Sequence, residues 1–107
     1  MAKKQKINIP EQQLVRQIIK YLNLRGHLVW RNNTGMFKDQ RGHWYRFGLK
    51  DSADIIGVAK DGRMIAIECK AAGKTPTLPQ VHFLGEIDQR GGVALIAYDL
   101  ATVQRQL

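Results

Sequence analysis

The sequence predicts an α/β protein, with a mixed sheet flanked by helices. Apolar residues recur at helical spacing in residues 11–25, and residues 78–90 lie between a helix start signal and a glycine stop. The segments around them are short apolar or alternating runs of strand length. Their order is helix, strand, hairpin, two strands, helix, strand and helix. Such a series buries its apolar faces most economically by packing helices against one sheet.

The length and composition predict one domain spanning residues 1–107. The chain is 44% hydrophobic, which suffices for one core, and no repeat or linker divides it. Residues 1–6 form a basic arm that we expect to be flexible. They lack the apolar run of a signal peptide, and no stretch approaches membrane-spanning length, so we expect a cytoplasmic protein with no membrane partner.

The first helix is expected over residues 11–25, with Gly26 as its stop. A short strand follows at residues 27–31, and residues 32–35 form a polar loop. The apolar stripe of the helix predicts a core face made of Leu14, Val15, Ile18, Ile19 and Leu22.

Residues 36–47 predict a hairpin folded about residues 39–42. Interleaved aromatic and basic residues suit nucleic acid binding, through stacking on bases and contact with phosphates. Structural packing or a dimer interface explains the aromatic residues about equally well. The aromatic residues are Phe37, Trp44, Tyr45 and Phe47, and the basic ones are Lys38, Arg41 and Arg46.

The loop between the strands at residues 53–58 and 64–70 sets their register, and it can close in two ways. A two-residue turn would place Asp54 opposite Cys69 and away from Glu68. A three-residue loop with Gly62 left-handed pairs Asp54 with Glu68, whose β-carbons are then roughly 5 Å apart. Strand alternation puts Lys70 on the Glu68 face and leaves Ile65, Ile67 and Cys69 on the other face, which we expect to be core.

The remaining elements complete the sheet. Residues 71–76 form a loop, and residues 78–90 form a helix that ends at two glycines. Residues 93–98 are an apolar run typical of a buried strand. Asp99 is placed to cap a short final helix that reaches Gln106.

The pairing of Asp54 with Glu68 indicates a metal site. Two close carboxylates in a partly dehydrated site stay ionised only if a cation neutralises them, and oxygen ligands favour Mg²⁺ or Mn²⁺. Such an ion polarises a phosphate and lowers the pKa of bound water, while Lys70 can hold the attacking hydroxide or the developing charge. The alternative is a plain ion pair between Glu68 and Lys70 on an exposed strand face, with Asp54 merely beginning a strand.

The charge balance indicates a polyanionic partner. The chain has 17 basic and 9 acidic residues, a formal net charge of +8, which favours nucleic acid, although a solvated basic surface is the alternative. The single cysteine, Cys69, excludes an internal disulfide framework and a cysteine-based zinc cluster. The three histidines have no metal-ligand spacing.

From residue 11 to residue 98 the chain resembles a stand-alone VRR-NUC domain, a branch of the PD-(D/E)XK or restriction-endonuclease-like superfamily. Ala53 departs from the family, which often has proline there. The resemblance implies a restriction-endonuclease-like core and a metal ligand set of Asp54, Glu68 and the Cys69 carbonyl, with Glu11 as a further candidate. The catalytic residues it implies are Glu11, Asp54, Glu68, Lys70 and Gln80.

Two of these residues have a structural alternative. Glu11 fits an Asn8-x-x-Glu11 helix cap, and Gln80 fits a Thr77-x-x-Gln80 capping box. Capping and a role at the site can coexist in one side chain.

The resemblance implies a Mg²⁺- or Mn²⁺-dependent DNA endonuclease that leaves 5′-phosphate and 3′-hydroxyl ends. We expect a homodimer selective for branched DNA, similar to Holliday-junction resolvases, in replication, recombination or repair in a bacterial or phage setting. The alternatives are a DNA nuclease with little structural preference, a non-catalytic DNA-binding module, or an RNA substrate. The candidate nucleic acid contacts are Arg31, Asn33, Lys38, Arg41, Arg46, Lys50 and Lys74.

Overall fold

The computed structural model describes residues 9–107, so the expected basic arm at residues 1–6 lies outside the described residues. None of the helices in the described part is long and apolar enough to span a bilayer. All the expected elements form, and their ends differ from the expected ones by at most two residues. They are α1 (Glu11–Leu24), β1 (Leu28–Arg31), β2 (Gly35–Lys38), β3 (Trp44–Phe47), β4 (Ile55–Val58), β5 (Met64–Cys69), α2 (Leu78–Gln89), β6 (Val93–Ala97) and α3 (Leu100–Gln106).

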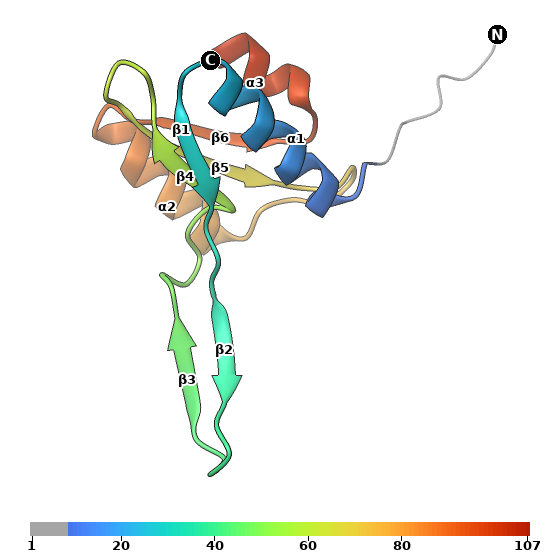
Figure 1. The fold of residues 1–107 in the computed structure, drawn as a ribbon, viewed down its shortest axis with the longest axis vertical. Coiled ribbons are helices and arrows are strands. Elements are labelled where there is room, and N and C mark those ends of the chain that lie inside the picture. The colour runs from blue at the N-terminus through green and yellow to red at the C-terminus, as the bar shows by residue number, and fades with distance from the viewer. Residues whose placement is uncertain (1–8) are drawn as a thin grey trace, which may run out of the picture.

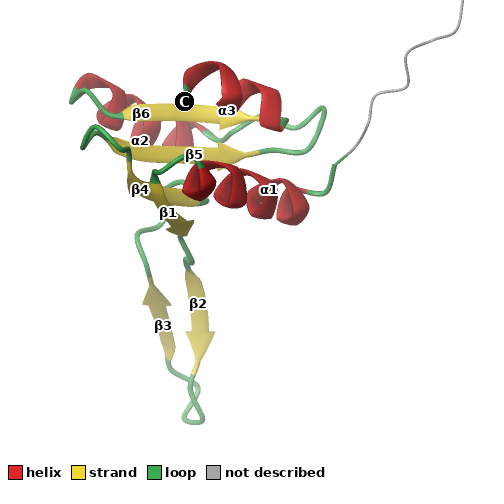
Figure 2. Cartoon of the chain, turned by 45° about the horizontal axis from the view of Figure 1, so that its top comes forward, coloured by secondary structure: helices red, strands yellow, loops and turns green. Residues whose placement is uncertain are grey.

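Four strands form a mixed sheet in the order β1-β4-β5-β6 (Figure 1). The first two pairings are antiparallel, whereas β5 and β6 run parallel because α2 connects them as a crossover. Helices α1 and α3 pack on one face of this sheet and α2 packs on the other (Figure 2). The α/β class expected from the sequence, with a mixed sheet flanked by helices, is therefore confirmed.

The stripe of α1 supplies much of the larger core cluster. Leu14, Val15, Ile18 and Leu22 are buried, and Ile19 packs against the cluster while partly exposed. Gly26 has a φ of 93°, a left-handed conformation that glycine adopts without strain, and the helix ends just before it. The amphipathic period was therefore a sufficient signal for this helix.

Strand β5 is covered on both faces. Ile65, Ile67 and Cys69 face the core cluster of α1 and α3, as expected, whereas Ala66 belongs to the cluster beneath α2. Glu68 is only 4% exposed. The alternative in which the acid lies on an exposed strand face is therefore wrong, because α2 covers that face.

The loop between β4 and β5 has three residues. The Ala59 N–H donates to the Arg63 carbonyl at 2.7 Å, the Gly62 N–H donates to the Ala59 carbonyl at 2.8 Å, and Gly62 has a φ of 93°. Ile55 consequently pairs with Ile67, and continuing this register by one residue sets Asp54 opposite Glu68. The two-residue alternative, which separates the carboxylates, is wrong.

Strand β6 differs from the expected buried strand. Val93 and Ala97 are buried, but the three residues between them are only partly buried. Within the described chain β6 pairs with β5 alone and so forms an edge of the sheet. An apolar run does not distinguish a central strand from an edge strand, because strand order is set by tertiary packing.

Strands β2 and β3 form a separate two-stranded sheet that projects from the body of the protein (Figures 1 and 2). Its turn lies at the expected place, where the Asp39 N–H donates to the His43 carbonyl at 2.8 Å and the Gly42 N–H donates to the Asp39 carbonyl at 3.1 Å. Every residue of β3 is exposed. The hairpin therefore lies outside the hydrophobic core.

Candidate active site

Asp54 is held at the entrance to β4 by contacts from the end of β1. The Asn32 amide group donates to Ser52 Oγ at 2.6 Å and to the Ala53 carbonyl at 2.8 Å. The Asn32 backbone N–H donates to the Asp54 carbonyl at 2.8 Å. These three bonds fix the backbone on either side of Asp54, so Asn32 positions the acid without reaching its carboxylate.

The Asp54 carboxylate points toward the end of β5. Its Oδ2 atom accepts a hydrogen bond from the Cys69 N–H at 2.8 Å. The pKa of Glu68 is raised to about 7, chiefly by burial and then by the neighbouring Asp54 carboxylate, while the Lys70 ammonium acts to lower it. The two acids predicted from the sequence therefore interact directly through their charges.

Two donors from different elements converge on one oxygen of Glu68. Lys70 Nζ lies 3.6 Å from Glu68 Oε1, and Gln80 Nε2 donates to the same atom at 3.4 Å. Lys70 follows β5, and Gln80 lies in the first turn of α2. The structure therefore brings four of the five predicted catalytic residues together, with Glu68 at their centre.

Gln80 also forms the expected capping box of α2. Its Oε1 accepts from the Thr77 N–H at 2.9 Å, and its own backbone N–H donates to Thr77 Oγ1 at 3.3 Å. One end of the amide therefore caps the helix while the other end contacts Glu68. The two interpretations of Gln80 coexist, as the sequence allowed.

Glu11 lies at the edge of this group. Its Oε1 atom accepts a hydrogen bond from the Ala71 N–H at 3.1 Å, which ties the start of α1 to the residue after Lys70. Pro10 is the N-cap of α1 and makes no side-chain cap, while Asn8 of the alternative capping arrangement lies outside the described residues. Glu11 thus contacts the backbone near the site and does not line its pocket.

A pocket of about 240 Å³ opens over the two acids. Arg46 and Lys50, two of the predicted nucleic acid contacts, line it together with Gln80. Its other polar wall, in which Ser52 is buried and Asp51 has a φ of 63°, was not predicted from the sequence. The polar run just before Asp54 was the available signal. The complete lining is Thr34, Gly35, Met36, Arg46, Phe47, Lys50, Asp51, Ser52, Asp54, Glu68 and Gln80.

The other predicted nucleic acid contacts lie outside this pocket. Lys38 and Arg41 belong to the outer end of the β2–β3 hairpin, and the exposed Lys74 follows β5. Arg31 donates to Gln12 Oε1, so its guanidinium is already engaged within the protein. Asn33 is exposed. Of the seven, Arg46 and Lys50 are therefore the ones that line the pocket of the two acids.

The donor set fits a hydrated divalent ion. Among residues 9–107, no three or more His, Cys, Asp and Glu side chains are grouped so that they could hold a metal by themselves. Magnesium usually takes only one or two carboxylates and completes its shell with water and phosphate oxygens. Asp54 and Glu68 fit that pattern and do not fit a closed structural metal site.

Cys69 contributes its backbone and not its thiol. Burial, followed by the charges of Asp54 and Glu68, raises the pKa of the Cys69 thiol far above its usual range. The thiolate is the nucleophilic form of cysteine, so this side chain is chemically inert at neutral pH. Cys69 is a core residue, as expected.

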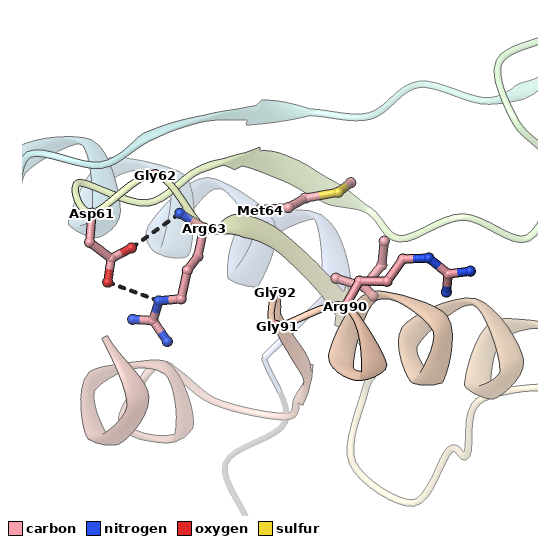
Figure 3. A pocket seen from close by; sticks show the side chains of 8 residues that line it. Asp61, Gly62, Arg63, Met64, Arg90, Gly91 and Gly92 are labelled. Carbon is pink, nitrogen blue, oxygen red and sulfur yellow. Dashed lines mark hydrogen bonds and ion pairs between the residues drawn. The ribbon is translucent and has the colours of Figure 1, made fainter.

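A larger pocket, of about 450 Å³, lies at the other end of β5 (Figure 3). Its charged residues already have partners, because Arg63 Nε donates to Asp61 Oδ2 at 2.8 Å and Arg90 pairs with Glu86. Asp61 and Arg63 are also well exposed. This pocket holds no convergent set of polar groups, so the carboxylate pocket is the better candidate site.

Comparisons with protein-family models, with curated proteins and with solved structures found no match to this chain. The resemblance to the VRR-NUC family therefore rests on the motifs of the sequence, and a restriction-endonuclease-like core stays a prediction.

Proposed function

We propose that the protein is a Mg²⁺- or Mn²⁺-dependent endonuclease that hydrolyses DNA phosphodiester bonds. The observation that carries this proposal is the meeting of Asp54 and Glu68 in one pocket of a basic protein, with the Lys70 ammonium 3.6 Å from Glu68 Oε1. Two neighbouring carboxylates repel each other at neutral pH, which costs free energy unless a cation neutralises them. Such a pair beside a lysine is typical of a functional site.

Asp54 and Glu68 would hold the metal, with the Cys69 carbonyl as a third ligand. The Lys70 N–H donates to the Ala97 carbonyl in β6, and the Cys69 N–H donates to Asp54. Backbone groups alternate in direction along a strand, so the Cys69 carbonyl points to the same side as its N–H, toward Asp54. When bound, the metal polarises the phosphate and lowers the pKa of its bound water.

The protein side chains then orient the reactants. The Lys70 ammonium carries three donors, which can hold the attacking water and the charge that develops on the phosphate oxygens. Gln80 fixes the orientation of the Glu68 carboxylate, and Glu11 fixes the backbone that follows Lys70. Arg46 and Lys50, which line the pocket, would bind the phosphate backbone of the substrate.

We propose branched DNA as the substrate and a homodimer as the active form, acting in replication, recombination or repair. A domain of 107 residues offers little surface for reading a long sequence, so it is better suited to recognising DNA shape and backbone. Two symmetric incisions in a four-way junction require two active sites, which a twofold dimer supplies. Light scattering should give a dimer mass at working concentration, and a monomer mass with and without DNA would reject the dimer.

The decisive experiment is cleavage of an end-labelled four-way junction and of its linear duplex arms, each in Mg²⁺, in Mn²⁺ and in chelator. Glu68→Gln removes the buried charge with little change in shape. Glu86→Gln makes the same substitution at a partly buried glutamate of α2 that lies outside the carboxylate pocket. We expect metal-dependent cuts with wild type and Glu86→Gln, and none with Glu68→Gln.

The other outcomes separate the alternatives. Equal cutting of junction and duplex would retain the nuclease and reject structural selectivity. Tight binding without cutting would favour a non-catalytic DNA-binding module. Preferential cutting of an RNA of the same sequence would show that RNA, and not DNA, is the substrate.

A further inference from the structure

The β2–β3 hairpin carries a ladder of aromatic rings on one face. The register pairs Phe37 with Tyr45 and Gly35 with Phe47, so strand alternation places the three rings on the same side. Phe37 stacks on Tyr45 with 5.3 Å between ring centroids and lies 6.3 Å from Phe47. The ring of Phe47 covers Gly35, where a β-carbon would lie 2.8 Å from it.

These rings are largely exposed to solvent. Phe37 is 52% exposed, Tyr45 46% and Phe47 44%. A lone two-stranded hairpin is marginally stable in water, and contiguous exposed aromatic surface is typical of a binding site. The ladder is therefore suited to a partner with flat apolar faces.

The ladder is continuous with the carboxylate pocket. Phe47 and Arg46 line that pocket together with Asp54 and Glu68, and Phe37 and Tyr45 extend the ladder outward from Phe47. A nucleic acid strand with one phosphate at the carboxylates would therefore have its neighbouring nucleotides beside the rings.

The positive charge of the β2–β3 hairpin favours a polyanionic partner over a second copy of the hairpin. Residues 35–47 contain three basic residues and one acidic residue, within a chain of formal net charge +8. A second copy of the hairpin would meet like charge, whereas a polyanion meets opposite charge. Base stacking on aromatic side chains next to phosphate contacts is the usual mode of binding for single-stranded nucleic acid.

We propose that the face formed by Phe37, Tyr45 and Phe47 is a stacking platform for unpaired bases next to the scissile phosphate. This inference rests on the proposed nuclease function and narrows its substrate to DNA with a single-stranded segment beside the cut, as at a flap or an opened branch. The opposite face, where Lys38 Nζ lies 5.9 Å from the centroid of Trp44, contributes charge and no extended ladder.

Binding of a tailed duplex and of a blunt duplex, both in chelator, tests the platform separately from cleavage. The variants are Phe37→Ala/Tyr45→Ala, the same pair changed to tryptophan, and Trp44→Ala as a matched ring truncation on the opposite face. Stacking energies predict about tenfold or greater loss for the tailed duplex in the double alanine variant, with the blunt duplex unchanged. A 2-aminopurine in the tail should be quenched by wild type and by the tryptophan pair, and not by the double alanine variant.

If the double alanine variant bound both duplexes more weakly to the same extent, or if Trp44→Ala lost as much affinity for the tailed duplex, the stacking platform would be rejected. Unchanged affinity together with a dimer that dissociates in light scattering would instead identify the ladder as an interface between copies. Circular dichroism checks that each variant is folded. Because binding is measured without metal, a selective loss of tail binding supports the platform even if the cleavage assay rejects the nuclease.

Discussion

Gln80 links the cap of α2 to the buried carboxylate of Glu68. Its Oε1 accepts from the Thr77 N–H at 2.9 Å, while its Nε2 donates to Glu68 Oε1 at 3.4 Å. The start of the helix and the centre of the candidate site are therefore positioned by the same amide. Because each end of the amide has its own partner, substitutions can separate the two roles.

Thr77→Ala and Gln80→Ala should destabilise the protein to a similar extent and differ in activity. Each removes one half of the capping box, which costs about 1 kcal/mol in the free energy of unfolding. Only Gln80→Ala also frees the Glu68 carboxylate, so we expect it to lower kcat at least tenfold more than Thr77→Ala. Urea unfolding and cleavage kinetics measure the two effects, and equal activity of the two variants would reduce Gln80 to a cap.

The stability of the metal-free protein should fall as pH rises from about 4.5 to about 7. The pKa of Glu68 is about 7 in the folded state, against 4.5 for the free side chain, so over this range the folded protein holds a proton that the unfolded chain has lost. The stabilisation is complete below pH 4.5 and is lost through pH 7. Thermal unfolding across this pH range, in chelator, measures the slope.

Glu68→Gln should abolish that slope and stabilise the metal-free protein at pH 8. We expect a gain of about 2 kcal/mol, less than the full pKa shift implies because solvent in the pocket screens the charge. Mg²⁺ should raise the melting temperature of wild type at pH 8 and leave Glu68→Gln unchanged. Equal stabilisation of both proteins by Mg²⁺ would place the ion elsewhere.

Lys70→Met should remove cleavage while DNA binding persists. The substitution keeps the aliphatic length of the side chain and removes the ammonium that faces Glu68 Oε1 at 3.6 Å. Loss of one donor to a developing oxyanion lowers kcat by about 10²–10³-fold. Single-turnover cleavage measures this effect, with Lys20→Met as the control at an exposed lysine of α1. A purely structural ion pair would instead change stability and leave kcat intact.

Glu11→Gln distinguishes a metal ligand from a backbone contact. The amide oxygen of glutamine can still accept from the Ala71 N–H, so the unfolding free energy should change little, whereas Glu11→Ala should cost about 1 kcal/mol. A metal role for the carboxylate predicts that Glu11→Gln requires more Mg²⁺ for half-maximal cleavage. An unchanged Mg²⁺ requirement would leave Glu11 with the backbone contact alone.

Gly57→Ala and Gly85→Ala should have opposite effects on stability. A β-carbon at Gly57 would clash with the Leu28 carbonyl oxygen, so the β1–β4 pairing must shift, at a cost of about 2–3 kcal/mol. A β-carbon at Gly85 meets nothing within 4 Å, and alanine stabilises a helix interior by about 0.5–1 kcal/mol relative to glycine. Chemical denaturation gives the free energy of unfolding of both variants. It therefore tests the close β1–β4 approach at Gly57 and the open space around Gly85 in α2.

The fold class and the pairing of the acids could be predicted because local patterns encode them. Helix α1 follows from its apolar period and its glycine stop, and the β4–β5 register follows from loop chemistry at Gly62. Once that register is set, the two-residue period of strands brings Asp54 and Glu68 together. Each of these steps involves residues close in sequence.

The sequence by itself therefore determined the element types and the facing acids, and only the tertiary structure decided what surrounds them. Helix α2 buries Glu68 and directs Gln80 toward it, and Asn32 fixes the turn before Asp54. Strand β6 lies at an edge of the sheet in the described chain. All of these features depend on contacts between residues far apart in the sequence. No local period specifies such contacts, because they arise when separate elements share one core. The raised pKa of Glu68 has the same origin, since burial by α2 and the approach of Asp54 exist only in the folded chain.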